Sequence, residues 1–369
     1  MIKFFDLQKI NAAYQEQFQE KMKLILDKGW YILGDEVNSF EKNFANYCSS
    51  KYCIGVGNGL DALTLIFKGY IALGKMKKGD EVIVPANTFI ATILSVLQAD
   101  LVPVLVEPKL ETYTINSDLI QDKITSKTKA ILAVHLYGQL AEIDKINAIA
   151  IQNNLIVVED AAQSHGALLG KNRKSINTQS FSFYPAKNLG ALGDGGAIIT
   201  NDEELAKVLF SLRNYGSEVK YHNNYIGINS RLDELQAAFL NVKLPNLDAD
   251  NEHRRTVAKR YLSEIKNNKI TLPFWDFSNN HVFHLFVIRT EKRKELQDYL
   301  KENGIETMIH YPVPPHKQKA FSPETSGWNN LSFPITEKIY NEVLSLPISP
   351  IMTADEVDFV IQKLNLWTS

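Results

Sequence analysis

The stretch FSFYPAKNLGALGDGGAIIT, residues 181–200, decides the fold of this chain, because it sets a single lysine between an apolar run and a cluster of glycines. Lys187 follows Tyr184 and Pro185, and glycines recur from Gly190 onward. A lysine that only served solubility would lie among polar residues on an exposed surface. Lys187 is therefore a candidate for a functional amine, in a site built around this segment.

The composition is that of an ordinary globular protein. The chain has 369 residues, of which 45% are hydrophobic and 22% are charged, and its formal net charge is −2. This near-neutral balance predicts no nucleic-acid partner and no membrane-surface partner. No apolar run reaches about 18 residues, and the N-terminus lacks the pattern of a signal peptide. We therefore expect a cytoplasmic protein of two domains, or of one large domain with an appendage.

The two cysteines of the chain, Cys48 and Cys53, lie five residues apart. So few cysteines in a chain of this length are typical of a reducing compartment, where disulfides are rare. A single C-x4-C pair is a poor zinc signature, because structural zinc sites take four ligands. We expect two free thiols and no metal site.

Strand and helix patterns alternate between residues 50 and 200. Apolar runs typical of buried strands occur at 53–57, 81–85, 102–107, 130–138, 155–160, 180–184 and 196–200. Apolar residues at helical spacing occur at 60–73, 88–99 and 142–154. This alternation predicts a mostly parallel sheet covered by helices on both faces. In sheets of this kind, ligands bind beyond the carboxyl ends of the strands.

The pattern changes after residue 245. Helices are predicted at 246–266, 293–304 and 354–366, and strands at 281–290 and 306–312. We therefore divide the chain into a large α/β domain, residues 1–245, and a smaller C-terminal α+β domain, residues 246–369. This division still allows the N-terminal segment of the large domain to pack on the smaller domain.

A second candidate residue, Asp160, ends the apolar strand 155–160, and Gln163 follows it closely. Taken alone, Asp160 is explained more simply as the N-cap of a following helix. Its surroundings favour another role, since a carboxylate, a lone lysine and glycine-rich turns meet at one predicted sheet edge. These groups suit pyridoxal phosphate, which forms a Schiff base with a lysine and needs an acidic partner for its ring nitrogen.

The segment GVGNGLDAL, residues 55–63, opens a predicted helix. Backbone amides at a helix N-terminus bind phosphate groups, which fits the same cofactor. The competing interpretation is a dinucleotide-binding loop. That fingerprint requires G-x-G-x-x-G, whereas the glycines here read G-x-G-x-G, and Asp80 and Glu81 precede a strand instead of ending one. We therefore favour pyridoxal phosphate over the cofactor of a Rossmann oxidoreductase.

Ordered blocks along nearly the whole chain resemble those of the DegT/DnrJ/EryC1/StrS family of sugar aminotransferases. The blocks are FDL (5–7), YILGDEVNSFE (31–41), GNGLDAL (57–63), GDEVIVPANTFIAT (79–92), VHLYGQ (134–139), VEDAAQSHGA (158–167), SFYPAKNLGALGDGGAI (182–198), LRNYGS (212–217), GINSRLDELQAA (227–238) and HYPVPPH (310–316). The resemblance implies the aspartate aminotransferase fold, the three-layer αβα fold of type I pyridoxal-phosphate enzymes. It also implies that the large domain carries the cofactor.

The resemblance implies a role for individual residues. Lys187 would form the Schiff base and carry the proton, and Asp160 would pair with the ring nitrogen. The other implied cofactor contacts are Gly59, Leu60 and Ser182 at the phosphate, Phe89 stacked on the ring, Gln163 at the ring hydroxyl, and Asn229 at the phosphate of the neighbouring subunit. The implied substrate contacts are Tyr184, His310, Tyr311 and His316. A shared site of this kind makes a symmetric homodimer the minimal active unit.

Two residues also have simpler explanations than a role in the site. Without the resemblance, His316 in its proline-rich loop would be interpreted as a surface residue. Arg231 is a candidate for binding the carboxylate of the amino donor. An ion pair with Asp233 or Glu234 explains Arg231 equally well, because most surface arginines pair locally.

The resemblance further implies the reaction. L-Glutamate would supply the amino group, leaving pyridoxamine phosphate, and a nucleotide-linked keto sugar would receive it. Relatives with histidine at the lysine position are dehydratases, so Lys187 argues against that branch. The sequence KNLGALGDGG (187–196) is most similar to enzymes that aminate C3 of a dTDP-3-keto-6-deoxyhexose.

The product would be a dTDP-3-amino-3,6-dideoxyhexose, destined for surface polysaccharides such as O-antigens and S-layer glycans, or for antibiotics. Two alternatives stay open at this point. One is amination of C4 of a 4-keto sugar, and the more remote one is a regulator that binds the cofactor without turnover.

Overall fold

The computed structural model describes residues 1–168, 175–219, 221–321 and 328–368. In this part of the chain, the centre is a seven-stranded sheet of order β1-β7-β6-β5-β4-β2-β3. Its strands are Tyr52–Val56 (β1), Glu81–Pro85 (β2), Val102–Val106 (β3), Thr128–Val134 (β4), Ile156–Asp160 (β5), Thr178–Ser182 (β6) and Gly196–Thr200 (β7). Strand β7 runs antiparallel to both neighbours, and the remaining pairs are parallel. The predicted mostly parallel sheet is confirmed.

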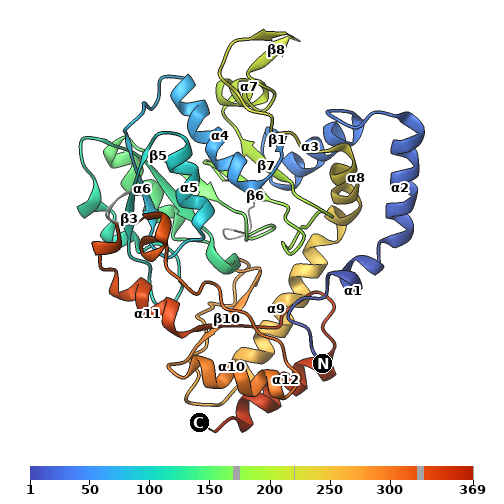
Figure 1. Cartoon of the computed structure of the whole chain (residues 1–369), viewed down its shortest axis with the longest axis vertical. Helices are drawn as coiled ribbons and strands as arrows, with labels where there is room; N and C mark the ends of the chain where they lie inside the picture. The colour runs from blue at the N-terminus through green and yellow to red at the C-terminus, as the bar shows by residue number, and fades with distance from the viewer. Residues whose placement is uncertain (169–174, 220, 322–327, 369) are drawn as a thin grey trace.

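Helices cover both faces of this sheet, which gives the three layers seen in Figure 1. Strand β4 shows why, because alternate residues of a strand face opposite sides. Ala130 and Leu132 pack in one apolar core, whereas Ile131 and Ala133 pack in another. The helices of the first face are Gly59–Ala72 (α4), Ile90–Gln98 (α5) and Glu203–Leu212 (α7), and those of the second are Asp35–Tyr47 (α3), Ile143–Asn153 (α6) and Glu234–Lys243 (α8).

A smaller core is built from the C-terminal part of the chain around the antiparallel pair β10 and β11. Its elements are Leu247–Glu264 (α9), Phe286–Arg289 (β10), Arg293–Glu302 (α10), Pro334–Glu342 (α11), Val343–Leu346 (β11) and Ala354–Leu366 (α12). The N-terminus joins this core, since Ile2 forms a β-bridge with Ile305. The domain boundary at residue 245 stays a prediction.

The remaining elements are two N-terminal helices, a short pair of strands and several 3₁₀ turns, of which Leu136–Gly138 is buried. They are Leu7–Ala12 (α1), Gln15–Lys28 (α2), the hairpin Ser217–Val219 (β8) with His222–Asn223 (β9), and 3₁₀ turns at Ser117–Leu119, Gln121–Lys123, Leu136–Gly138, Leu244–Asn246, Pro315–Lys317, Lys319–Phe321 and Trp328–Asn330. Within the described parts of the chain, every helix is too short or too polar to serve as a transmembrane segment. Cys48 and Cys53 are both buried free thiols.

Three predicted strands differ clearly from the structure. The strand predicted over 130–138 ends at Val134, and a 3₁₀ turn occupies Leu136–Gly138. The strand predicted over 281–290 is reduced to β10, because its first half hydrogen-bonds to that turn, with Val282 N donating to Gly138 O at 3.0 Å. The strand predicted over 306–312 is wrong, since only Met308 pairs, through a single bridge to Ser345.

Candidate active site

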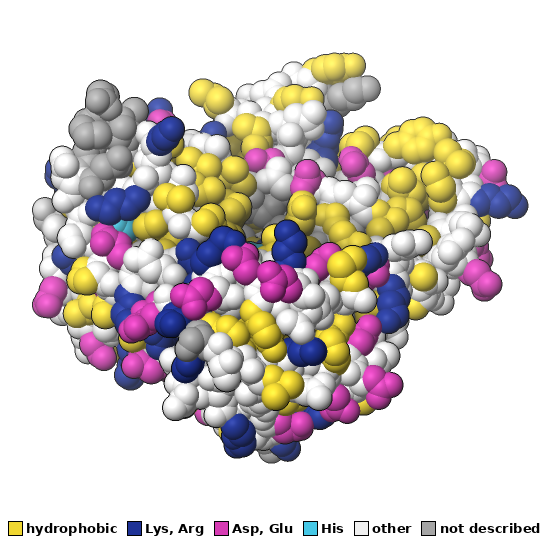
Figure 2. Space-filling model, turned by 60° about the horizontal axis from the view of Figure 1, so that its bottom comes forward, with side chains coloured by type: hydrophobic (Ala, Val, Ile, Leu, Met, Phe, Trp, Pro, Cys, Tyr) yellow, Lys and Arg dark blue, Asp and Glu magenta, His cyan; other side chains and the backbone are white. Residues whose placement is uncertain are grey.

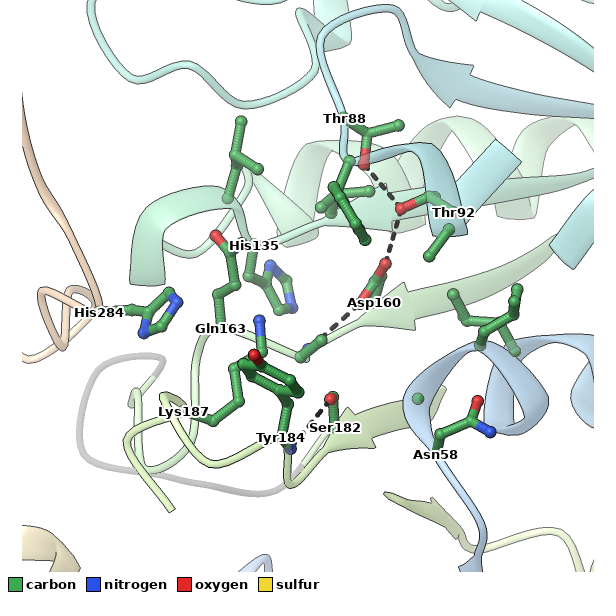
Figure 3. A pocket seen from close by; sticks show the side chains of 18 of the residues that line it. Asn58, Thr88, Thr92, His135, Asp160, Gln163, Ser182, Tyr184, Lys187 and His284 are labelled. Carbon is green, nitrogen blue, oxygen red and sulfur yellow. Dashed lines mark hydrogen bonds between the residues drawn. The ribbon is translucent and has the colours of Figure 1, made fainter. Parts of the chain in front are cut away.

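A cavity of about 480 Å³ lies at the carboxyl ends of the central strands (Figure 3). Strands β4, β5 and β6 end at it, helices α4 and α5 begin at it, and residues of the C-terminal part close it. Its lining is Asn58, Gly59, Leu60, Leu63, Thr88, Phe89, Ala91, Thr92, Val134, His135, Leu136, Asp160, Ala162, Gln163, Ser182, Tyr184, Ala186, Lys187, Asp194, His284, His310 and Tyr311. We call this space the central cavity.

Lys187 reaches the central cavity from the loop that follows β6. The loop turns sharply there, with Lys187 N donating to Tyr184 O at 2.8 Å and Ala191 N donating to Phe183 O at 2.8 Å. Burial of the amine lowers the pKa of Lys187 to about 8, and the nearby charge of Asp160 opposes that shift only in part. A lysine with such a pKa is partly a neutral amine at physiological pH, so it can act as a nucleophile and as a base.

Asp160 faces the same cavity from the last position of β5. Its Oδ2 accepts a hydrogen bond from Thr92 Oγ1 at 2.8 Å, and its Oδ1 accepts one from Ala162 N at 3.2 Å. Burial raises the pKa of Asp160, and these two hydrogen bonds offset the rise in part. The N-cap interpretation is wrong, because residues 161–168 form turns and no helix follows Asp160 in that described stretch.

The N-terminus of α4 forms a narrow cradle against the end of β6. Asn58 caps the helix, with its Oδ1 accepting from Asp61 N at 2.8 Å. A Cβ atom at Gly59 would lie 2.7 Å from Cβ of Ser182, so only glycine allows the two segments to approach this closely. The first amides of a helix lack acceptors within the helix, which leaves the Gly59 and Leu60 N–H groups suited to an anion.

Gln163 connects the cavity wall to the C-terminal part of the chain. Its Oε1 accepts from Tyr137 N at 2.5 Å, and its Nε2 donates to Tyr311 Oη at 3.1 Å. The Tyr311 ring in turn lies 5.1 Å from the ring of Phe89, centre to centre. Burial raises the pKa of Tyr311 above its usual value, so the phenol keeps its proton and can donate it into the cavity.

The structure thus brings together most of the residues that the sequence singled out. Those that line the central cavity are Gly59, Leu60, Phe89, Asp160, Gln163, Ser182, Tyr184, Lys187, His310 and Tyr311. Tyr184 stands at the rim, with 56% of its surface exposed. His310 is held by Ser345 Oγ at 2.9 Å from Nδ1, and burial lowers its pKa to about 4. The part that each residue plays stays a prediction.

Two of the implied site residues lie outside this lining. His316 is fully buried, with Nε2 2.9 Å from Glu337 Oε1 and its ring edge-on to Phe333, so the surface interpretation is wrong. Asn229 is exposed and forms a β-bridge with Asn214. Its position leaves any contact with a cofactor to a second subunit.

Arg231 makes neither of the local ion pairs that we considered. Its Nη1 donates to Asn214 Oδ1 at 2.9 Å, and its guanidinium lies 5.4 Å from the ring centre of Tyr215. Glu234 serves another purpose, because its carboxylate accepts backbone N–H groups of Gly34 and Val37 at 2.8 and 2.9 Å. It therefore caps the first turn of α3, which begins directly after Gly34.

Thr92, His135 and His284 are among the cavity-lining residues that sequence reasoning missed. Thr92 lies in the first turns of α5, where only the fold shows that it reaches Asp160. His135 directly follows β4, but the strand predicted over 130–138 includes this position, so the prediction hid it from view. His284 comes from the C-terminal part of the chain, and no local pattern connects it with Lys187.

Comparison with known proteins agrees with this geometry. Residues 12–365 match the model of the DegT/DnrJ/EryC1/StrS aminotransferase family, and the chain belongs to that family. It is 56% identical, over 99% of each chain, to the dTDP-3-amino-3,6-dideoxy-alpha-D-galactopyranose transaminase of Aneurinibacillus thermoaerophilus. The predicted family and the predicted enzyme class, a sugar aminotransferase, are confirmed.

Solved structures show the same fold over nearly the whole chain. The structure of S. venezuelae DesV in complex with a ketimine intermediate superposes with a TM-score of 0.94, at 42% identity, over 99% of this chain and 98% of that one. The structure of NtdA from Bacillus subtilis with bound cofactor PMP gives a TM-score of 0.87, at 35% identity, over 95% of this chain and 81% of that one. The predicted type I fold is therefore confirmed.

Proposed function

We propose that this chain uses pyridoxal phosphate to transfer an amino group to C3 of a dTDP-linked 3-keto-6-deoxyhexose. The observation that carries the proposal is that Lys187 and Asp160 face one cavity, beside the N-terminus of α4. Only a glycine at position 59 allows this N-terminus to approach β6 so closely. An amine, a carboxylate and an anion cradle are the three groups that this cofactor requires. Bound pyridoxal phosphate would supply an electron sink for the carbon that loses its proton.

The residues of this chain would perform distinct tasks. The Gly59 and Leu60 amides and the Ser182 hydroxyl would hold the phosphate. Asp160, ionised and shielded from water, would keep a proton on the ring nitrogen. Lys187 Nζ would take the proton from the reacting carbon and return it, since its pKa of about 8 suits both directions near neutral pH.

The sugar substrate and the regiochemistry are supported by sequence. The relative from A. thermoaerophilus is named for a 3-amino-3,6-dideoxy sugar of galacto configuration, and the segment KNLGALGDGG is of the type we associate with C3 amination. We propose L-glutamate as the amino donor and the cytoplasm as the location. The product would serve the building of surface polysaccharides or of antibiotics.

A homodimer with shared active sites is part of the proposal. Asn229 is exposed and outside the central cavity of its own chain, which suits a contact across an interface. Hydrophobic side chains gather over the region of α2, at the right of Figure 2. The exposed large ones there are Met22, Leu24, Leu26, Trp30 and Tyr31. An exposed apolar patch of this size is typical of a protein–protein contact.

The decisive experiment is an assay of the purified protein with L-glutamate and dTDP-linked 3-keto- and 4-keto-6-deoxy sugars. We expect amination of the 3-keto sugar, with the position of the new C–N bond read by NMR. Amination at C4 would establish the first alternative, and absence of turnover with bound cofactor would establish the regulator. Lys187→Ala should abolish turnover, whereas the control Lys207→Ala, at an exposed lysine of α7 that pairs with Glu203, should leave turnover unchanged.

The shared site is tested by mixing two inactive variants, Lys187→Ala and Asn229→Asp. A mixed dimer has one site with both defects and one site with neither. Random assortment makes about half of the dimers mixed, so activity should recover to about a quarter of the wild-type value. Mixed dimers confirmed by native mass spectrometry but inactive would mean that each site is built within one chain.

A further inference from the structure

His284 enters the central cavity from the segment that joins the C-terminal part of the chain to the turn after β4. Val282 N donates to Gly138 O at 3.0 Å and Leu285 N donates to Tyr137 O at 3.2 Å, which fixes the backbone on both sides of the histidine. A Cβ atom at position 138 would lie 2.8 Å from His284 N, and Gly138 has φ +102°. The close approach of these two segments therefore requires glycine, and it brings His284 to the cavity wall.

The hydrogen bonds around His284 determine which ring nitrogen carries the proton. Asn188, the residue after Lys187, donates its Nδ2 hydrogens to Asn251 Oδ1 at 2.7 Å and to Val282 O at 3.1 Å. Its Oδ1 then faces Nδ1 of His284 at 3.2 Å and can only accept. In the neutral ring, Nδ1 therefore carries the hydrogen, and Nε2 is left with a lone pair.

The surroundings of His284 keep the ring neutral. Burial lowers the pKa of His284 well below its usual value, and the positive charges of Lys187 and Arg254 lower it further. The other titratable groups that act on it are His310 and His165, and both of these also have low pKa values because of burial. No carboxylate is among the groups that shift it in the described residues. The ring is thus neutral near physiological pH, where its Nε2 is a hydrogen-bond acceptor.

Lys187 is the matching donor. Figure 3 shows His284 and Lys187 on the same side of the central cavity. In the described part of the chain, Lys187 rests without a side-chain hydrogen bond to its amine, which is therefore able to turn toward an acceptor, and Asp160 acts on it only through its charge. An ammonium or amine in a cavity of this kind needs an acceptor to fix its direction. The neutral nitrogen of His284, which lines the same cavity, offers one.

We infer that His284 Nε2 accepts a hydrogen bond from the free amine of Lys187 and so aims that amine at the reacting carbon. His284 is then a positioning residue, acting through Lys187, with Asn188 selecting the tautomer that makes this possible. The consequence for the rate rests on the aminotransferase function proposed above. The consequence for the titration of Lys187 does not, because it concerns the protein without cofactor.

Two substitutions at His284 distinguish the roles of its two ring nitrogens. In His284→Asn, the amide can replace Nδ1 toward Asn188, but nothing replaces Nε2. In His284→Gln, the longer amide places an oxygen near the position of Nε2. The matched control is His281→Asn, in the same segment, because His281 is buried outside the cavity lining. Its Nδ1 accepts from Phe283 N at 3.0 Å and its ring also bonds to the Gly138 backbone, so this variant tests a disturbance of the segment alone.

The first measurement is the pKa of Lys187 in the full chain freed of cofactor, from the pH dependence of its acetylation by acetic anhydride, read by mass spectrometry. An acceptor stabilises the ammonium form, so its loss lowers the lysine pKa. We expect a fall of about one unit in His284→Asn, the size of one hydrogen bond to a charged group. His284→Gln should retain most of the wild-type value, and His281→Asn should retain all of it.

The second measurement is the kcat–pH profile of transamination. A misaimed amine should lower kcat about tenfold to a hundredfold in His284→Asn, with little change in the KM for the keto sugar. The rising acid limb of the profile should move to lower pH together with the pKa of Lys187. An unchanged Lys187 titration in a folded His284→Asn protein overturns the inference, and so does a change confined to KM, which would make His284 a sugar contact. If the wild-type protein proves not to be an aminotransferase, the titration of Lys187 still tests whether His284 accepts a hydrogen bond from its amine.

Discussion

Two neighbouring carboxylates at the end of β5, Glu159 and Asp160, are both buried but have opposite surroundings. Burial disfavours the charge of Glu159, yet its four donors outweigh burial and lower its pKa. Asp160 has two hydrogen bonds, and burial raises its pKa. The donors to Glu159 are His135 Nε2 at 2.9 Å, Gln179 Nε2 at 2.5 Å, Ser175 Oγ at 2.5 Å and Asn177 Nδ2 at 2.8 Å.

The difference follows from the alternation of side chains along a strand. Glu159 points into the protein, where its hydrogen bonds are complete, so its charge stabilises the fold. Asp160 points into the central cavity, where part of its hydrogen-bonding capacity is left for a ligand. One residue step along the chain thus separates a carboxylate with complete hydrogen bonds from the one that we predict to be functional.

The largest expected effect is on the rate, from Asp160→Asn. The amide cannot stabilise a proton on the ring nitrogen of the cofactor, so we expect kcat to fall by about a thousandfold or more, with a modest loss of bound cofactor. Single-turnover kinetics and the absorbance of the cofactor measure the two effects. Wild-type turnover in this variant would show that Asp160 has no part in the mechanism and that its role does not differ from that of Glu159.

The next effect is on stability, from Glu159→Gln. The new amide N–H₂ group would face donors, so we expect a loss of about 3 kcal/mol in the free energy of unfolding, measured by denaturant titration. The lowered pKa of Glu159 makes its contribution complete above about pH 4.5 and lost as the pH falls through the folded-state value. The variant should therefore resemble the wild type in acid. A large fall in kcat without loss of stability would contradict the structural role.

A smaller effect is expected from Thr92→Val. Thr92 gives its only hydroxyl proton to Asp160, so it must accept from Thr88, whose Oγ1 lies 2.7 Å away. Loss of the donor should raise the pKa of Asp160 further and lower kcat about tenfold. Thr88→Val, which removes the donor to Thr92 and leaves the bond between Thr92 and Asp160 in place, is the matched control and should cost less than Thr92→Val. Equal losses in the two variants would indicate a packing defect in α5 instead.

The smallest effect concerns the stability of the cofactor-free protein. The folded-state pKa of Asp160 is raised, so its contribution favours folding in acid and is lost as the pH rises through that value. Asp160→Asn without cofactor should therefore melt about 2 °C higher than the wild type near pH 7, and the gain should vanish in acid. A lower melting temperature at pH 7 would show that the Asp160 charge stabilises the fold.

Much of the fold could be predicted because its signals are local. The strand predicted over 81–85 is β2, and the helix predicted over 354–366 is α12. The errors gather where segments far apart in the sequence meet. The segment 281–285 has the apolar pattern of a strand, but its hydrogen bonds go to the turn at Leu136–Gly138, and no local pattern encodes that partner.

The sequence by itself determined those candidate residues that residue type and local position identify. They are Lys187 isolated after an apolar run, Asp160 at the end of a strand, and Gly59 at the start of a helix. It could do so because strand ends and helix starts are set by neighbours in the chain. Only the tertiary structure decided what surrounds them. The bond from Thr92 to Asp160, the buried place of His316 and the position of His284 in the cavity lining arise from contacts between distant segments, which no local pattern encodes.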